Sequence, residues 1–274
     1  MIQLHNKSPY WAISQDGMFR MMEASLPDGV DISLLMSNKD DRKWVRDALS
    51  LYINQRPDMQ IHNGVAEIHL HGPMITDGSP VDLAMGATDY AEIIEDIELA
   101  NFDEEVKSII LVCNTPGGTV QGIAETYDAI LKSEKPIHAY VETSATSAGY
   151  YLAAACESIT VSPSAISGNI GTILSYWDLT DVYESMGAKQ ETFTNAGADL
   201  KGTFGTRLSD SQREFVQAMV DEMGQQFQNR VLENRPHVDA EVFRAGWYTA
   251  EKAGSLGLID AVGTMEELKE IVAR

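Results

Sequence analysis

Apolar and polar residues alternate along the middle of the chain in blocks whose lengths distinguish strands from helices. Short apolar runs predict strands over residues 65–71, 108–113 and 137–141. Apolar residues at helical spacing predict helices over 90–99 and 122–131, between those strands. Strands and helices that alternate in this way are typical of an α/β fold with a largely parallel sheet that is buried on both faces.

The two ends of the chain have a more helical pattern. Residues 1–58 are expected to form a helical N-terminal extension that packs on the main domain or on a neighbouring subunit, because they contain no group of chemically active residues. The later elements are predicted as strands over 158–161 and 190–194, a helix over 209–233, then helix, strand and helix over 249–256, 259–262 and 264–272. The predicted organisation is an extension followed by one domain over residues 59–274.

Charge and composition narrow the range of partners. The chain of 274 residues has 41 acidic and 20 basic side chains, a net charge of −21 that disfavours binding to nucleic acid or to an anionic membrane. No secretory signal opens the sequence, and no apolar stretch approaches the roughly 20 residues of a membrane span, so we expect a cytoplasmic protein without a membrane anchor. Cys113 and Cys156 lie in apolar runs and are expected to be core thiols.

Two segments with small residues are candidates for chemistry. Asn-Thr-Pro-Gly-Gly at 114–118 follows a predicted buried strand, where Gly117 and Gly118 would let backbone N–H groups approach a ligand and form an oxyanion hole. The simpler interpretation is a strand-to-helix turn. Ser147 stands among small residues at 143–153 where another strand leads into a helix, so it is either a nucleophile or the cap of that helix.

A nucleophilic serine needs a base, and the histidines do not supply an obvious one. His69 and His71 share one face of a strand, a spacing that suits a metal, but no third ligand has convincing spacing. The alternative base is a lysine kept neutral by burial. Lys201 ends a polar, glycine-rich stretch that has the character of an active-site loop, although alone it would be taken for an exposed loop lysine.

Five ordered motifs together resemble the signal peptide peptidase A (SppA) family of serine proteases over residues 60–270. They are Asn-Thr-Pro-Gly-Gly at 114–118, Ser-Ala-Thr-Ser-Ala-Gly-Tyr-Tyr at 144–151, Ser-Gly-Asn-Ile-Gly at 167–171, Ala-Gly-Ala-Asp-Leu-Lys at 196–201 and Gly-Trp-Tyr-Thr-Ala-Glu-Lys-Ala-Gly-Ser-Leu-Gly-Leu-Ile-Asp at 246–260. The helical extension and the Val-Ala-Glu-Ile-His-Leu-His-Gly strand are most similar to the phage head-maturation branch, related to phage lambda protein C.

The resemblance implies a fold, a catalytic pair and a set of partners. The fold would be the spiral of ββα units shared by ClpP and the crotonases. Ser147 would be the nucleophile of a Ser-Lys dyad and Lys201 its general base, with the N–H groups of Gly118 and Ala148 as oxyanion donors and Gly117 in support. No cofactor or metal is implied. The implied partners are a protein or peptide substrate, further copies of the chain in a ring, and capsid, portal or scaffold proteins inside a phage prohead.

Two features depart from the family pattern. Three residues separate Gly197 from Lys201, one more than is usual, and Asn169 replaces the serine expected to orient the lysine amine. The carbonyl of Asn169 still accepts a hydrogen bond, so Asn169 is assigned the same supporting role.

Three other functions stay open on the sequence. An inactive relative used for capsid assembly or scaffolding is one, and a host cytoplasmic peptidase that degrades proteins is another. A crotonase that stabilises an acyl-CoA enolate is disfavoured, because an acidic chain offers few basic residues for the phosphates.

Overall fold

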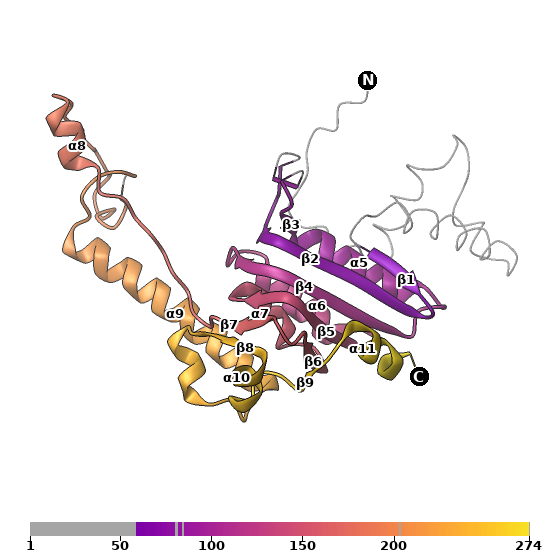
Figure 1. The fold of residues 1–274 in the computed structure, drawn as a ribbon. Coiled ribbons are helices and arrows are strands. Elements are labelled where there is room, and N and C mark those ends of the chain that lie inside the picture. Colours follow the sequence, from indigo (N-terminus) through magenta and orange to yellow (C-terminus); the bar gives the residue numbers. More distant parts are fainter. Residues whose placement is uncertain (1–58, 80–81, 84, 203, 274) are drawn as a thin grey trace, which may run out of the picture.

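A mixed α/β sheet forms the centre of the computed structural model, which describes residues 59–79, 82–83, 85–202 and 204–273. Within these residues one sheet has the order β1-β2-β4-β5-β6-β9, with β3 beside β2 and with β7 joining β5 to β8 (Figure 1). The strands are β1 (Met59–His62), β2 (Val65–Ile75), β3 (Thr88–Asp89), β4 (Ser108–Gly118), β5 (Ile137–Thr146), β6 (Ser158–Val161), β7 (Ile166–Gly168), β8 (Trp247–Thr249) and β9 (Ala261–Val262). All pairings are parallel except β1 with β2 and β7 with β8.

Helices connect the parallel strands, as their topology requires. The helices are α5 (Tyr90–Phe102), α6 (Ile123–Lys132), α7 (Ala148–Ala153), α8 (Thr180–Ser185), α9 (Asp210–Asn234), α10 (Ala250–Ser255) and α11 (Met265–Val272), with a 3₁₀ helix over Ala240–Arg244. Most agree with the predicted ranges to within about three residues. The α/β class expected from the sequence is therefore confirmed.

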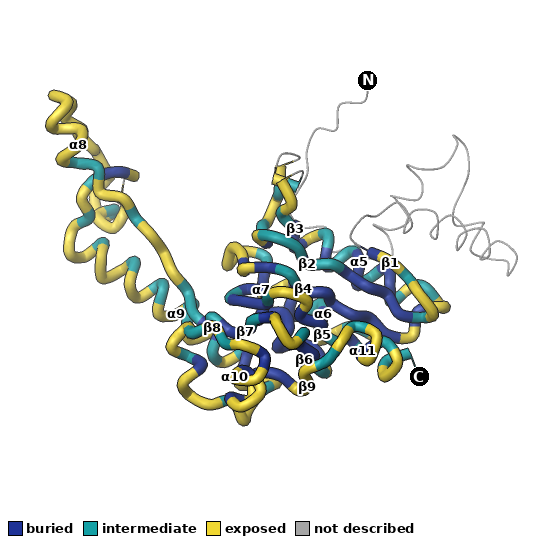
Figure 2. The backbone as a smooth tube through the Cα atoms, in the orientation of Figure 1, coloured by how far each residue is buried: buried dark blue, intermediate teal, exposed yellow. Residues whose placement is uncertain are grey.

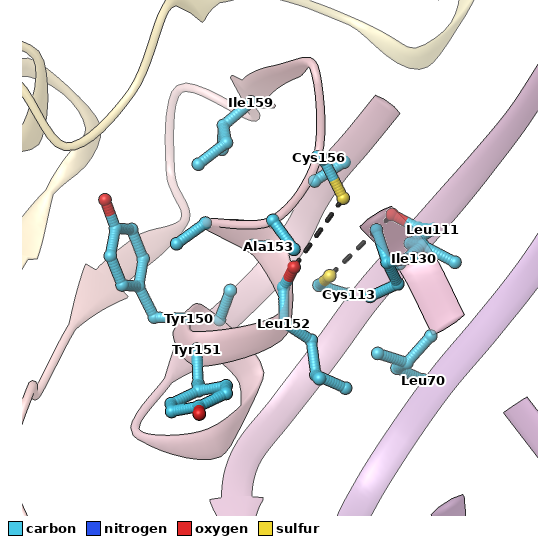
Figure 3. Close-up of a cluster of buried hydrophobic side chains, with 14 of the residues drawn as sticks. Leu70, Leu111, Cys113, Ile130, Tyr150, Tyr151, Leu152, Ala153, Cys156 and Ile159 are labelled. Carbon is cyan, nitrogen blue, oxygen red and sulfur yellow. Dashed lines mark hydrogen bonds between the residues drawn. The ribbon is translucent and has the colours of Figure 1, made fainter. Parts of the chain in front are cut away.

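The alternation of side chains along β4 explains why its residues 109–113 are all apolar. Ile109, Leu111 and Cys113 face the larger buried cluster, which α5, α6 and α7 complete (Figure 3). Ile110 and Val112 face a smaller cluster that Leu268 of α11 covers from the other side. Because a strand's side chains alternate between the two faces of the sheet, a central strand covered on both faces has apolar residues at successive positions.

Two local predictions are wrong. The 114–118 motif is not a turn that leads directly into a helix, because β4 continues through Gly118 and α6 begins only at Ile123. The strand expected over 190–194 does not form, and all five residues are exposed. A strand needs a partner for its backbone, and those residues pair with no strand in the described part of the chain. The extension predicted over 1–58 lies outside the described residues.

Between β7 and α9 the chain leaves the sheet and returns, over residues 171–208, here called the arm. Figure 1 shows it extending away from the sheet with α8 at its far end, and Figure 2 shows that it is mostly exposed. Arg207 pairs with Asp178 and Asp181 at 3.0 and 2.8 Å, which joins the two sides of the arm. Large apolar side chains are nonetheless exposed along it: Ile173, Leu174, Trp177, Val182, Tyr183, Met186, Phe193, Leu200 and Phe204.

Candidate active site

Ser147 occupies the junction between β5 and α7 in a strained backbone conformation. Its φ of 54° and ψ of −123° lie in a region that side-chain-bearing residues rarely adopt. The strain is held in place from both sides, because Ser147 N–H donates to Gly168 O at 2.9 Å and Ser147 O accepts from Tyr151 N–H at 2.9 Å. A sharp, strained strand-to-helix turn is a known way to present a serine hydroxyl to a substrate.

The alternative role for Ser147, capping of α7, does not describe the structure. Ser147 stands at the N-cap position, but its side chain makes no capping hydrogen bond to the helix. The first N–H groups of a helix have no partner within it, and Ala148 N–H is the first of α7. Ser147 Oγ is thus not occupied in capping, and a backbone donor lies directly beside it in the sequence.

The end of β4 lies against Ser147, as the oxyanion-hole interpretation requires. A Cβ atom on Gly117 would lie 2.7 Å from Ser147 Cβ and 3.1 Å from Ser147 Oγ, and Gly117 has a φ of 117°. Both the contact and the dihedral angle exclude a side chain here. A Cβ on Gly118 would lie 2.0 Å from Met74 O of the neighbouring strand β2. Both glycines are therefore required by close backbone approach.

The direction of the Gly118 N–H group follows from the pairing of β4. Thr119 N–H donates to Met74 O of β2 at 2.9 Å. Successive N–H groups of an extended strand point to opposite sides, so Gly118 N–H points away from β2. On that side the pairing of β4 with β5 ends at Thr115 and Ala145, just before Ser147. Gly118 itself is exposed.

Asn169 stands beside the residue that fixes Ser147. Its φ is 56°, and its N–H donates to Gly246 O at 2.7 Å. A Cβ on the preceding Gly168 would lie 2.8 Å from the same Gly246 O. From the sequence, a role was predicted only for Asn169 in the 167–171 motif. The structure adds Gly168, whose carbonyl holds Ser147, and the signal was the glycine of that motif.

Lys201 is not brought to Ser147 within the single chain. It is exposed in the arm, where its N–H closes a turn onto Ala198 O at 3.1 Å. The neighbouring Asp199 O accepts from Gln212 Nε2 at 3.1 Å, which fixes this loop to the start of α9. Contact with α7 occurs fifteen residues further along α9, where the Phe227 ring lies 5.0 Å from that of Tyr151. At 1.5 Å per residue, Gln212 and Phe227 are roughly 20 Å apart along α9.

Among the described histidines, none makes a hydrogen bond to Ser147 Oγ. The rings of His69 and His71 stack with centroids 5.2 Å apart, as expected for side chains on one face of β2. His138 begins β5 and Ser147 follows its end, so they are about 30 Å apart along the strand. Burial lowers the pKa of His138, whose Nδ1 lies 2.8 Å from Ser158 Oγ. In the residues described, no three potential ligands are placed to hold a metal.

The core behind Ser147 holds α7 in position. Tyr150 OH donates to Leu258 O at 2.7 Å, and the ring of Tyr151 lies 5.1 Å from that of Tyr127. The predicted core location of the two cysteines is confirmed, since both are buried free thiols. Burial raises the pKa of Cys113 to about 12, so it stays a thiol and packs as a small apolar side chain.

The model of peptidase family S49 matches residues 129–274, more than half of the chain and including Ser147, the arm and the C-terminal elements. The chain belongs to this family. The Clp protease model also matches, over residues 79–165, which contain α5 to β6. The SppA-type resemblance and the expected ClpP-like α/β fold are thereby confirmed.

Individual relatives of this S49 member match over three quarters of it or slightly less. Capsid assembly protease C of Escherichia phage lambda is 28% identical over 213 residues, which cover 75% of this chain and 48% of the relative. The chloroplastic serine protease SPPA of Arabidopsis thaliana is 28% identical over 209 residues, 74% of this chain and 30% of the relative. The chain thus spans half or less of the length of these relatives.

A solved structure of an enoyl-CoA hydratase/isomerase family member superposes with a TM-score of 0.48 at 16% identity, covering 78% of this chain and 72% of its own.

In the described ranges, no helix combines the length and apolar character needed to cross a bilayer.

Proposed function

We propose that this S49 family member is a serine endopeptidase with Ser147 as nucleophile and Lys201 as general base. The observation that carries the proposal is the backbone of Ser147. A strained serine at a strand-to-helix junction, with its side chain free of the helix and Gly117 against it, is the arrangement that presents a nucleophile beside an oxyanion hole. Membership of a peptidase family supports the same reading.

The proposed reaction proceeds through an acyl-enzyme. Ser147 Oγ attacks the peptide carbonyl carbon while its proton passes to Lys201 Nζ, and the oxyanion accepts hydrogen bonds from Gly118 N–H and Ala148 N–H. Lys201 then returns the proton to the departing amine as the C–N bond breaks. A water molecule, deprotonated by the same lysine, then attacks the ester carbonyl. The bond from the carbonyl carbon to Ser147 Oγ breaks, Lys201 returns the proton to Ser147 Oγ, and the carboxylic acid product leaves. The side-chain carbonyl of Asn169 is proposed to hold the lysine amine by accepting a hydrogen bond from it.

The separation of Lys201 from Ser147 makes assembly part of the proposal. A lysine is a base at neutral pH only when its amine is neutral, which needs burial, and Lys201 is exposed on the isolated chain. The arm that carries it also exposes Trp177 at 70% and Phe193 at 89%, more apolar surface than a free loop normally retains. We propose that the arms pack in a homo-oligomer, which buries Lys201 and places it near a Ser147.

The proposed substrates are the scaffold and capsid proteins of a phage head during maturation. Support comes from the similarity to capsid assembly protease C of phage lambda and to the head-tail preconnector protein GP5 of phage P21, the latter 24% identical over 174 residues. Such an enzyme would work inside the prohead. A host cytoplasmic peptidase that degrades proteins is the alternative setting for the same chemistry.

One observation favours a second candidate, an assembly or scaffold protein without hydrolytic activity. The loop of Lys201 is attached to α9 at Gln212, roughly 20 Å along the helix from the contact of Phe227 with α7, so an inactive chain would need no rearrangement. In that case the apolar arm would serve assembly alone.

Labelling with a serine-reactive fluorophosphonate tests the proposal. The full chain in its native assembly is treated with the probe at several pH values, and the adduct is located by mass spectrometry. We expect an adduct on Ser147 that is absent from Ser147→Ala and strongly reduced in Lys201→Ala, with a rate that rises with pH as the base loses its proton. An assembled wild-type protein that takes no probe at Ser147 would support the scaffold candidate.

A further inference from the structure

Thr115 connects the segments that surround Ser147, although it carries no role in the mechanism above. It is fully buried in β4, two residues before Gly117. Its hydroxyl donates to Gly72 O at 2.6 Å and accepts from Gly117 N–H at 3.1 Å. The hydroxyl therefore ties the bend in β2 to the glycine pair at the end of β4.

The methyl group of Thr115 makes a second connection, to the nucleophile helix. A Cβ on Gly149, the second residue of α7, would lie 2.5 Å from Thr115 Cγ2. Only a glycine lets the start of α7 approach β4 this closely. The main chain adds a third link, because Thr115 O accepts from Ser144 Oγ of β5 at 3.2 Å.

Each of the two proposed oxyanion donors is next in sequence to a glycine that Thr115 contacts. Gly118 N–H follows Gly117, which the hydroxyl holds, and Ala148 N–H precedes Gly149, against which the methyl packs. Two donors stabilise one oxyanion only if their separation and directions are fixed before the reaction. A residue that contacts both supporting segments is the one able to set that separation.

We propose that Thr115 is a positioning residue that fixes Gly118 N–H relative to Ala148 N–H. The inference rests on the proposed function, in which those groups hold the oxyanion. Thr115 acts through the backbone of Gly117 and Gly149 and does not touch the substrate. Its hydroxyl holds the β4 side and its methyl sets how closely α7 approaches.

Substitutions at Thr115 separate these two contributions. Thr115→Val keeps the shape but leaves Gly72 O and Gly117 N–H without their partner, so the β4 end is free to shift. Thr115→Ser keeps the hydroxyl and removes the methyl. Thr115→Ala removes both, so a comparison of Ala with Ser isolates the hydroxyl even where Val does not fold. Thr126→Val is the matched control, because its buried hydroxyl donates to Gly122 O at 2.9 Å on α6.

The readout is the rate at which Ser147 takes the fluorophosphonate, with thermal unfolding measured in parallel. We expect Thr115→Val and Thr115→Ala to react roughly 10- to 100-fold more slowly than wild type, since small displacements in an active site cost up to about that factor. Thr115→Ser is expected to stay within about threefold, and Thr126→Val to lose melting temperature without losing rate. Relative to wild type, the slower variants should also lose more affinity for a peptide boronate, which mimics the tetrahedral state, than for a substrate peptide.

Three results would overturn the inference, and they are distinguishable. If wild-type Ser147 takes no probe, the proposed function fails and the role of Thr115 fails with it. If wild type reacts but Thr115→Ala and Thr115→Ser react equally fast, the proposed function stands and the hydroxyl has no positioning role. A rate in Thr126→Val that falls in parallel with Thr115→Val would assign the effect to stability alone.

Discussion

The surroundings of Ser147 and of Lys201 differ in how fully the chain determines them. Ser147 is held by backbone hydrogen bonds on both sides, by two glycines that cannot be replaced and by a helix buried in the core. Lys201 lies in an exposed arm, where its loop is attached to α9 by Gln212 (Figure 2). One half of the proposed dyad is complete in the single chain, and the other half is not.

This difference indicates where activity would be controlled. A strained nucleophile is stable only because the surrounding fold over-determines it, so it does not need a partner to form. An exposed lysine is charged and unreactive as a base. If Ser147 and Lys201 form the proposed dyad, the free chain is expected to be inactive and to become active on assembly.

The largest effect is expected in an assembly of two coexpressed variants, which tests directly whether a Lys201 from one chain serves the Ser147 of another. Lys201→Ala alone is expected to lower labelling of its intact Ser147 roughly 10²- to 10⁴-fold, the usual contribution of a general base. Coexpression with Ser147→Ala, which supplies an intact Lys201 but takes no probe itself, should restore labelling of the Lys201→Ala chain. The two chains differ in mass, so the adduct is assigned directly.

Recovery in the mixed assembly means that the dyad forms between chains. Labelling that stays absent in a confirmed mixed assembly would mean instead that the arm of each chain folds back onto its own Ser147. A coexpressed double variant, Ser147→Ala with Lys201→Ala, is the negative control.

Truncation of one apolar side chain in each region tests the contrast in stability. Leu111→Ala empties a fully buried position of β4 in the larger cluster and should lower the free energy of unfolding by about 2–5 kcal/mol. Phe193 is 89% exposed on the arm, so Phe193→Ala should change it by no more than about 0.5 kcal/mol in the dissociated chain while weakening self-association. Denaturant titration and sedimentation measure the two effects. Equal losses of stability would show that the arm is as integral to the fold as the sheet.

The smallest expected effect concerns the pH dependence of the sheet. Burial lowers the pKa of His138, and the nearby Glu157 only partly opposes this. The unfolded chain therefore binds a proton at His138 before the folded chain does, and stability falls as the pH drops below about 6.5. Between pH 7 and pH 5 wild type should lose a few degrees more in melting temperature than His138→Gln. An identical pH profile for the two proteins would contradict this assignment.

The sequence was sufficient for most of the fold because local pattern and tertiary structure agree there. β4 and β5 begin at their predicted first residues but extend five residues past their predicted ends, and α9 lies within one residue of its predicted range. Prediction was wrong at 190–194, where apolar and β-branched residues suggested a strand but no neighbouring strand pairs with them. Strand formation depends on a partner elsewhere in the chain, which periodicity does not reveal.

The candidate site was predictable as a set of motifs and not as an arrangement. Ser147, Gly117 and Gly118 could be chosen because small residues and glycines at strand ends have few other uses. The positive φ of Ser147 and the contacts of Thr115 were not predictable, since both depend on segments more than 20 residues apart in the sequence.

By itself, the sequence determined the α/β class, the buried strands, the core cysteines and the order of the family motifs, because hydrophobic period and residue type are local properties. Only the tertiary structure decided that Gly117 meets Ser147, that Gly168 holds it in a strained turn, and that Lys201 stands apart on an arm. These are properties of through-space contact between distant segments, which form only when the sheet and its helices have packed.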